Sequence, residues 1–177
     1  MKKSVMIGLL TGFALAALFI YFKPYKVAVD PIDIIGSDVI TKDSEYKLVF
    51  FGYAGCYHFC DPRLRQIEPI YKELKKSLDV KMLFVEISAE AKPVDSERFV
   101  KDVNSEFEAV NPDSDSLKVL QKQFQNVYVR KMPDGEYLHS GFLYLLRKYE
   151  QKYYLLKIYP DFTDAKALIA DIKKISD

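Results

Sequence analysis

The residues that could do chemistry are concentrated in one short segment, FFGYAGCYHFCDPRL, at positions 50–64. It contains Cys56 and Cys60, the only two cysteines of the 177-residue chain, and His58, one of its two histidines. The other histidine, His139, lies far along the chain. Thiolates and imidazoles bind soft metal ions, and a pair of thiols can also be oxidised to a disulfide. The segment therefore predicts a metal-binding or redox-active cysteine pair.

A structural disulfide is the less specific interpretation of this pair. Two residues four apart near a helix start can reach the Cα separation of about 4.4–6.8 Å that a disulfide needs. Such a bond closes a very short loop, so it would stabilise the fold little. A thiolate at a helix start is favoured by the helix amides, which lower its pKa. We therefore expect reactivity or metal binding at Cys56 and Cys60.

The cysteine pair lies between a predicted strand and a predicted helix. Residues 46–53, YKLVFFGY, form a short β-branched and aromatic run that is typical of a buried strand. Residues 62–78 show apolar side chains at helical spacing, with Asp61 as the expected N-cap and Pro62 in the first turn. Open α/β sheets carry their functional groups at the carboxyl ends of strands, which is where this pair falls.

The rest of the chain continues the alternation of strands and helices. The sequence predicts a strand at 80–88, amphipathic helical segments at 96–107 and 115–124, two strands at 141–147 and 152–159, and a closing helix at 163–175. Strands separated by helices imply parallel crossovers, and a terminal hairpin adds antiparallel strands. The predicted fold class is α/β: a thioredoxin-like domain whose central mixed sheet is flanked by helices.

An apolar segment near the amino terminus predicts a membrane anchor. Residues 4–22, SVMIGLLTGFALAALFIYF, carry no charge, and about 19 helical residues come close to the ~30 Å hydrocarbon core of a bilayer. A cleaved signal peptide is the alternative, because Ala14-Leu15-Ala16 resembles a cleavage site. We expect an uncleaved transmembrane helix within residues 1–22, a linker at 23–45 and a folded domain at 46–177. The expected orientation is a cytoplasmic amino terminus and a periplasmic or otherwise extracytoplasmic domain.

The charge balance excludes one large class of partners. The chain has 26 Lys and Arg residues against 25 Asp and Glu residues, which gives a formal net charge of +1. It also has no block rich in lysine or arginine. Nucleic-acid binding is therefore not expected.

Two segments resemble the Sco (SenC/PrrC) family of copper chaperones. In that family a strand ending in Phe-Gly-aromatic leads into a Cys-x-x-x-Cys pair and a helix, as LVFFGYAGCYHFCDPRLRQIEPIY does here. A distant histidine then precedes an aromatic-rich strand, and EYLHSGFLYLL places His139 at that position. The resemblance implies copper as the metal, with Cys56, Cys60 and His139 as its ligands. It further implies a role in assembling the copper centre of a respiratory cytochrome oxidase, through contact with the oxidase's copper-binding subunit or another copper-handling protein.

The sequence departs from the family pattern around this motif. Tyr57 follows the first cysteine and Asp61 follows the second, where the family usually has proline. The acidic segment after the second strand is present only in diluted form, as EISAEAKPVDSER at 86–98. These departures leave the three proposed ligands in place and affect the surface on which a partner would dock.

The donor set by itself also suits copper. Two thiolates and one imidazole form a soft three-coordinate set for Cu(I), and Cu(II) could be held with an added oxygen ligand. A structural zinc site normally has four protein ligands. His58 could be the fourth only by folding back between the cysteines, so we expect it in a partly exposed loop or at a partner contact.

A thiol-disulfide oxidoreductase acting on client cysteines is the main alternative function. Enzymes of that kind that resemble thioredoxin use Cys-x-x-Cys with a cis-proline opposite the pair. Here His139 stands where that proline would be expected, and no proline lies beside it. An inert interaction module would not need two cysteines and a histidine to converge. The two activities can overlap, and both remain open at this point.

Overall fold

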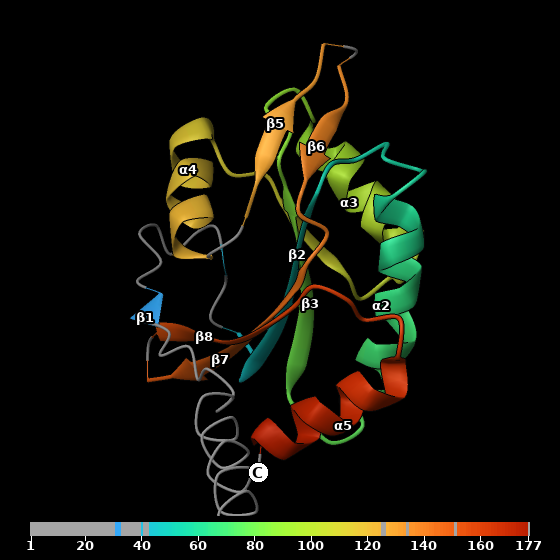
Figure 1. Ribbon diagram of the computed structural model, residues 1–177, viewed down its shortest axis with the longest axis vertical. Helices are drawn as coiled ribbons and strands as arrows, with labels where there is room; N and C mark the ends of the chain where they lie inside the picture. The colour runs from blue at the N-terminus through green and yellow to red at the C-terminus, as the bar shows by residue number, and fades with distance from the viewer. Residues whose placement is uncertain are drawn as a thin grey trace, which may run out of the picture.

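The computed structural model describes residues 31–32, 40, 43–124, 127–133, 135–150 and 152–176 (Figure 1). The predicted anchor at 1–22 and most of the predicted linker lie outside these residues. Within the described ranges, no helix combines the length and the apolar character needed to cross a membrane.

A six-stranded mixed sheet forms the centre of the domain (Figure 1). In spatial order its strands are β1 (Pro31–Ile32), β8 (Lys152–Tyr159), β7 (Leu143–Tyr149), β2 (Tyr46–Gly52), β3 (Val80–Glu86) and β4 (Glu108–Val110). Strands β2, β3 and β4 pair in parallel, whereas β7, β8 and β1 add on antiparallel to the other side of β2. The predicted mixed sheet with its terminal hairpin is confirmed.

Helices cover both faces of this sheet. They are α2 (Cys60–Leu74), α3 (Pro93–Lys101), α4 (Ser114–Gln123) and α5 (Ala165–Ser176). Helices α2, α3 and α5 lie on one face, and α4 lies on the other (Figure 1). Because the sheet is covered on both sides, every residue of the central strand β2 is buried, as is typical of parallel strands.

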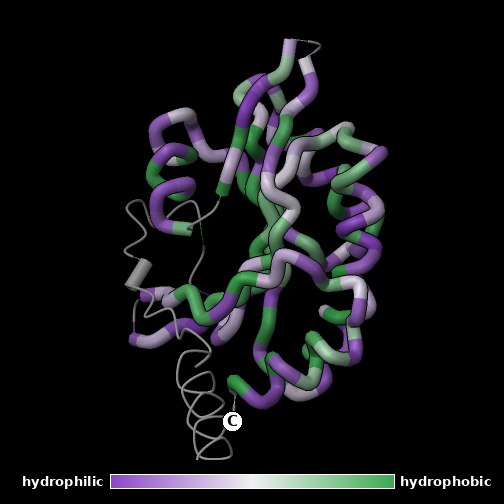
Figure 2. The backbone as a smooth tube through the Cα atoms, viewed as in Figure 1, coloured by the Kyte–Doolittle hydropathy of each residue, from purple (hydrophilic) through white to green (hydrophobic). Residues whose placement is uncertain are grey.

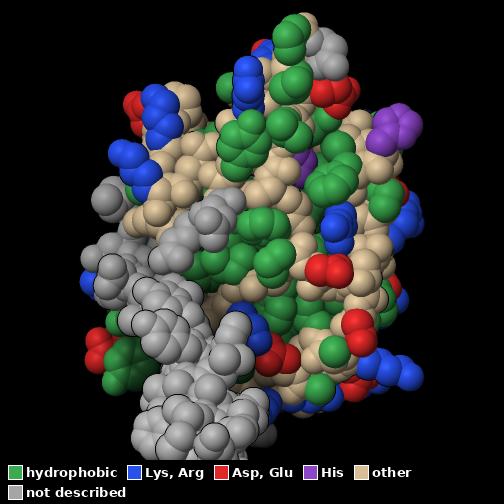
Figure 3. All heavy atoms as spheres, in the orientation of Figure 1, with side chains coloured by type: hydrophobic (Ala, Val, Ile, Leu, Met, Phe, Trp, Pro, Cys, Tyr) green, Lys and Arg blue, Asp and Glu red, His purple; other side chains and the backbone are tan. Residues whose placement is uncertain are grey.

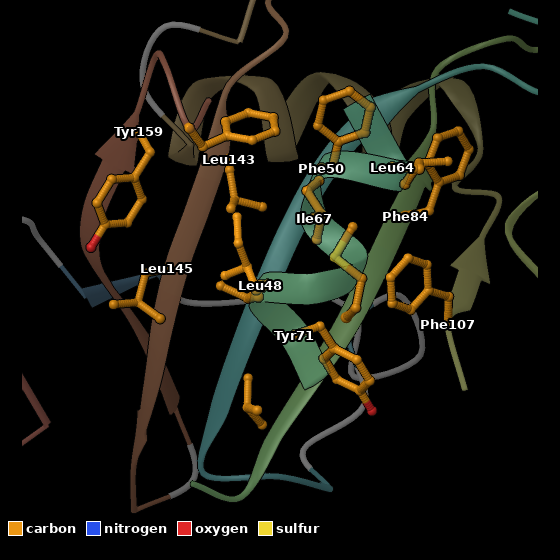
Figure 4. Packing of buried hydrophobic residues seen from close by; sticks show 14 of the residues in the cluster. Leu48, Phe50, Leu64, Ile67, Tyr71, Phe84, Phe107, Leu143, Leu145 and Tyr159 are labelled. Atoms are coloured by element: carbon orange, nitrogen blue, oxygen red, sulfur yellow. The ribbon is translucent and has the colours of Figure 1, made fainter. Parts of the chain in front are cut away.

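Alternation along β2 divides the core into two clusters. Leu48 and Phe50 face the side of α2 and α5, whereas Val49 and Phe51 face the side of α4. Figure 4 shows the first cluster, in which Leu48 and Phe50 pack between α2 and the neighbouring strands. In Figure 2 the central strands are mostly hydrophobic, and the helices alternate between polar and hydrophobic residues. The apolar runs of the sequence thus form the buried strands of a packed sheet, and the ends of these strands can carry a site.

The structure differs from the sequence prediction at three short strands. The helix predicted at 96–107 ends at Lys101, and the chain then enters β4, which was not predicted. Strands β5 (Val129–Lys131) and β6 (Tyr137–His139) form a separate two-stranded sheet that was also not predicted. Each of these strands has three residues, which is too short for the period-2 pattern that identifies a strand.

Candidate metal centre

The two cysteines lie on a tight loop that follows the central strand. The chain leaves β2 at Gly52 and turns back, so that the Cys56 N–H donates to the Tyr53 carbonyl (3.2 Å). Gly55 has φ +93°, a left-handed conformation that residues with a side chain rarely adopt. Gly52 must also lack a side chain, because a Cβ there would lie 2.9 Å from Cys60 Sγ. The two glycines let the loop bring both sulfurs against the strand end.

Helix α2 begins at the second cysteine. The backbone N–H groups of Cys60 and Asp61 both donate to the Cys56 carbonyl, at 3.1 and 3.2 Å, and Cys60 N also lies 3.4 Å from Cys56 Sγ. The predicted N-cap at Asp61 is therefore wrong: the N-cap position is Phe59, without a side-chain cap. Because Cys56 supplies the acceptors for the first amides, the helix starts before Pro62. Asp61 lies in the first turn and pairs with Arg65 (2.8 Å).

The distant histidine meets the cysteine pair. His139 ends strand β6, and its Nε2 lies 3.4 Å from Cys60 Sγ. The sulfurs of Cys56 and Cys60 and one ring nitrogen of His139 all lie within 4.8 Å of one another. Both cysteines are free thiols and are buried, at 8% and 0% exposure. The structure thus brings the three expected ligands together at the carboxyl end of β2.

The orientation of the imidazole suits a metal ligand. His139 Nδ1 lies 3.2 Å from the carbonyl oxygen of Ser140, which can only accept a hydrogen bond. The neutral ring therefore carries its proton on Nδ1 and presents the lone pair of Nε2 to the sulfurs. Metal-binding histidines are commonly fixed in this way by a carbonyl on the second nitrogen.

Three aromatic rings surround His139. The rings of Phe50, Tyr53 and Phe59 all meet it edge-on, with centroid distances of 6.4, 6.1 and 5.4 Å. Phe59 also covers Gly141, where a Cβ would lie 2.4 Å from its ring. In Figure 3 one histidine is visible only between hydrophobic side chains, whereas the other stands out at the surface. The enclosure limits the access of water to the imidazole.

His58 lies apart from this group. It is exposed on the turn between the two cysteines and is not among the residues whose donor atoms converge. Its neighbour Tyr57 is also exposed, at 69%. Both side chains are therefore available to an approaching molecule.

The two thiols differ in their electrostatics. A hydrogen bond from the Cys60 thiol holds the pKa of Cys56 well below its usual range despite partial burial. The same hydrogen bond to Cys56, together with deeper burial, raises the pKa of Cys60. Cys56 is thus the thiolate of the pair, and the Cys60 thiol donates a hydrogen bond to it.

Sequence reasoning did not identify Glu86 as a supporting residue of the loop. Its carboxylate is buried (2% exposed) at the end of β3 and accepts hydrogen bonds of 2.8 Å from Ala54 N, Ser88 N and Ser96 Oγ. Burial raises its pKa. It joins the cysteine loop to the connection between β3 and α3. The sequence signal that could have indicated Glu86 is its position: it is an acidic residue at the end of the apolar strand β3, which pairs with β2, the strand before the cysteines.

The donor set fits a soft metal ion. Within the described part of the chain, Cys56, Cys60 and His139 form the one group of at least three Cys, His, Asp or Glu residues able to converge on an ion. Two sulfurs and one imidazole nitrogen suit Cu(I), and a structural zinc site would need a fourth protein ligand. None of these three residues is a carboxylate, so the protein donors to a copper ion here would be two sulfurs and one nitrogen.

The fold and the site define a class of protein: a thioredoxin-like α/β domain with two thiols and an imidazole at the carboxyl end of its central strand. A family model described as SCO1/SenC matches residues 38–177. The chain therefore belongs to the SCO1/SenC family, and the family resemblance noted in the sequence is confirmed. The matched region begins before the predicted domain start at 46. A comparison with curated protein sequences found no significant match.

Solved structures of similar fold come from bacteria, plants and fungi. The solution structures of apo Sco1 from Thermus thermophilus share 23% identity over 75% of this chain and 80% of that one, with a TM-score of 0.61. The crystal structure of Arabidopsis thaliana ScoI with copper bound shares 19% identity over 74% and 83%, with a TM-score of 0.66. Yeast Sco1 with copper bound shares 19% identity over 73% and 75%, with a TM-score of 0.63. These similarities establish the fold.

Proposed function

We propose that this protein binds copper through Cys56, Cys60 and His139 and passes it to another protein. The observation that carries the proposal is the convergence of two sulfurs and one imidazole nitrogen within 4.8 Å. The burial of the two cysteines and the fixed imidazole tautomer favour metal binding over a chance cluster. The copper-bound structures of the Arabidopsis and yeast relatives support copper as the metal.

Titration of the reduced protein with Cu(I) tests this function. Anaerobic addition of Cu(I) in competition with a chromogenic Cu(I) chelator should show one copper ion per chain. Oxidation of Cys56 and Cys60 to a disulfide should abolish that binding, because the thiolate is the ligand. Equal copper retention by the reduced and disulfide forms would contradict the proposed site.

The client and the location belong to the same proposal. The client is the copper-binding subunit of a respiratory cytochrome oxidase or another copper-handling protein, and the domain is extracytoplasmic behind an uncleaved anchor at residues 1–22. The apolar run at 4–22 and the family membership support this assignment. A reporter that is active only outside the cytoplasm, fused after Asp177, should be active. Activity of a reporter that works only in the cytoplasm would overturn the location.

The unequal thiols favour thiol-disulfide exchange as a second candidate function. The Cys56 thiolate would attack a client disulfide and form a mixed disulfide, and Cys60 would then displace the client thiol. The client gains two electrons, and Cys56 and Cys60 become a disulfide, so turnover requires an external dithiol reductant. His139→Ala separates the two functions: it removes a copper ligand, whereas both sulfurs of the exchange reaction remain.

A further inference from the structure

The proposed histidine ligand is carried by a small sheet of its own. Strands β5 and β6 pair antiparallel from Val129↔His139 to Lys131↔Tyr137 and form a ribbon that projects at the top of Figure 1. Among the described residues, neither strand pairs with the six-stranded sheet. The cysteines, in contrast, follow directly on the central strand β2. Apart from the three-residue connection from His139 to β7, at residues 140–142, the position of His139 relative to the two sulfurs depends on side-chain contacts between the ribbon and the domain.

Tyr53 makes several of these contacts at once. It lies three residues before Cys56, on the chain that leaves β2. Its hydroxyl donates a hydrogen bond to the carboxylate of Glu136, which directly precedes β6. Its ring packs against Tyr137 (centroids 5.3 Å) and against His139 (6.1 Å). One side chain of the cysteine loop thus contacts both ends of the strand that presents the imidazole.

The other contacts of the ribbon are less directional. Lys131 pairs with Glu90, but both side chains are largely exposed, and exposed ion pairs of this kind contribute little. Val129 packs against the core cluster on the α4 side, and this apolar contact resists separation more than sliding. Phe59 contacts His139 edge-on through its ring, with the two centroids 5.4 Å apart. The Tyr53–Glu136 hydrogen bond is directional, so it can fix the ribbon along the strand axis.

We propose that Tyr53 and Glu136 are positioning residues that set the distance of His139 from the cysteine pair for copper binding. The inference rests on the proposed copper site and adds residues that are not ligands. Removing the hydrogen bond leaves all three donors present but lets the ribbon shift. Loss of an outer partner of a metal ligand typically lowers metal affinity about 10–100-fold, and we expect about tenfold here because the pair is partly exposed.

Three substitutions test the hydrogen bond itself. Tyr53→Phe removes the hydroxyl and keeps both ring contacts, and Glu136→Ala removes the acceptor. Glu136→Gln keeps an amide oxygen that can still accept, so it should restore much of the affinity lost in Glu136→Ala. Tyr128→Phe is the matched control, since it removes the hydroxyl of an exposed tyrosine just before β5. The double variant of Tyr53→Phe with Glu136→Ala should lose no more affinity than either single variant.

A second cycle identifies the group through which Tyr53 acts. The Tyr53 hydroxyl is also a hydrogen-bonding neighbour of Cys56, so it could influence copper through sulfur. If it acts by positioning the imidazole, Tyr53→Phe should lower Cu(I) affinity in the wild type and have no effect in the His139→Ala background. An equal loss in both backgrounds would overturn the proposal.

The Cu(II) spectra give a readout that a general loss of stability does not change. Paramagnetic resonance should show weaker nitrogen coupling in Tyr53→Phe and Glu136→Ala, while the thiolate-to-copper absorption persists. Thermal unfolding of the copper-free variants checks that the fold is retained. Absence of copper binding by the wild type would overturn the proposed function itself. Normal wild-type binding with unchanged affinity and nitrogen coupling in both variants would overturn only the positioning role.

Discussion

Cys60 Sγ lies 3.4 Å from His139 Nε2, although the two residues are 79 positions apart in the sequence. The contact joins the first turn of α2 to the end of β6, and therefore the rigid centre of the domain to the projecting ribbon. The cysteines and the histidine lie on different elements. Because these elements meet at the carboxyl end of β2, their three donor atoms form one site.

Replacing His139 should identify the histidine that binds copper. His139→Ala removes one of three donors. Loss of a residue that only orients a ligand lowers metal affinity about 10–100-fold, and the loss of the ligand itself should lower it further. The loss should be larger for Cu(II), which prefers nitrogen and oxygen donors. Competition titration with a chelator of known affinity measures both.

His58→Ala is the control for this prediction. His58 is exposed and lies outside the convergent group, so its variant should bind copper with near-normal affinity. A loss as large as that of His139→Ala would mean that the wrong histidine had been assigned.

The long periodic segments of the fold could be predicted from the sequence. Strands β2 and β8 and helix α4 lie within about two residues of their predicted bounds, because each has a clear apolar period and defined ends. The short strand β4 was missed, because three half-buried residues carry no period. The sequence predicts Asp61 as the helix N-cap, whereas the structure has Phe59 at that position and Cys56 as the acceptor for the first amides, which no sequence rule indicates.

The site was predictable only in part. The cysteine pair was recognised from its own residues, but its convergence with His139 came from the family resemblance, because periodicity does not specify which distant loops meet. The ribbon that carries His139 was not predicted, and neither was its contact with Tyr53 through Glu136. Side-chain contacts of this kind depend on the packed structure rather than on local pattern.

Gly52 should be required for the geometry of the pair. A Cβ at this position would lie 2.9 Å from Cys60 Sγ and 2.8 Å from the ring of Phe84, both in the buried core. Gly52→Ala should therefore lower the free energy of unfolding by about 1–3 kcal/mol, as overpacking typically does. It should also weaken copper binding, since Cys60 must move. Urea unfolding and Cu(I) titration measure the two effects.

Gly141→Ala provides the comparison for this substitution. Its Cβ would meet only the ring of Phe59, which is 40% exposed and can turn toward solvent. The loss of stability should be smaller than for Gly52→Ala. Equal losses would show that the buried contact with Cys60 is not what makes Gly52 necessary.

Glu86 should stabilise the cysteine loop through its hydrogen bonds. In Glu86→Gln an amide NH₂ replaces one oxygen, so at least one of the donors from Ala54, Ser88 and Ser96 loses its acceptor. An unsatisfied buried donor costs about 1–3 kcal/mol. Urea unfolding should show this loss, whereas Glu90→Gln, which alters an exposed ion pair, should leave stability nearly unchanged.

The effect of Glu86 should also depend on pH. Burial raises its pKa in the folded state, so the folded protein holds this proton more tightly than the unfolded chain does. The stabilisation linked to that proton is fully present below the unfolded value of about 4.3 and is lost as pH rises through the folded pKa. The stability of the wild type relative to Glu86→Gln should therefore decrease as pH rises above about 4.3. A difference that does not vary with pH would contradict the raised pKa.

The two cysteines should differ in reactivity without copper and be protected alike with it. Because the hydrogen bond from Cys60 lowers the pKa of Cys56, Cys56 should be a thiolate at neutral pH and react with iodoacetamide first. Cys60, whose pKa is raised, should stay unmodified up to about pH 8.5, the ordinary thiol value. Mass spectrometry of the alkylated protein measures each site.

The same lowered pKa predicts how the stability of the reduced protein changes with pH. A thiol whose folded pKa is depressed contributes stability that is present above the unfolded value of about 8.5 and is lost as pH falls through the folded pKa. Cys56→Ser should lack this dependence on the acid side, because it removes the thiol whose pKa the Cys60 hydrogen bond lowers.

One equivalent of Cu(I) should block alkylation of Cys56 and Cys60 equally, since each sulfur is one of only three donors. Full labelling of either cysteine in the presence of bound copper would exclude that sulfur as a ligand, whatever the order of their reactivity without the metal.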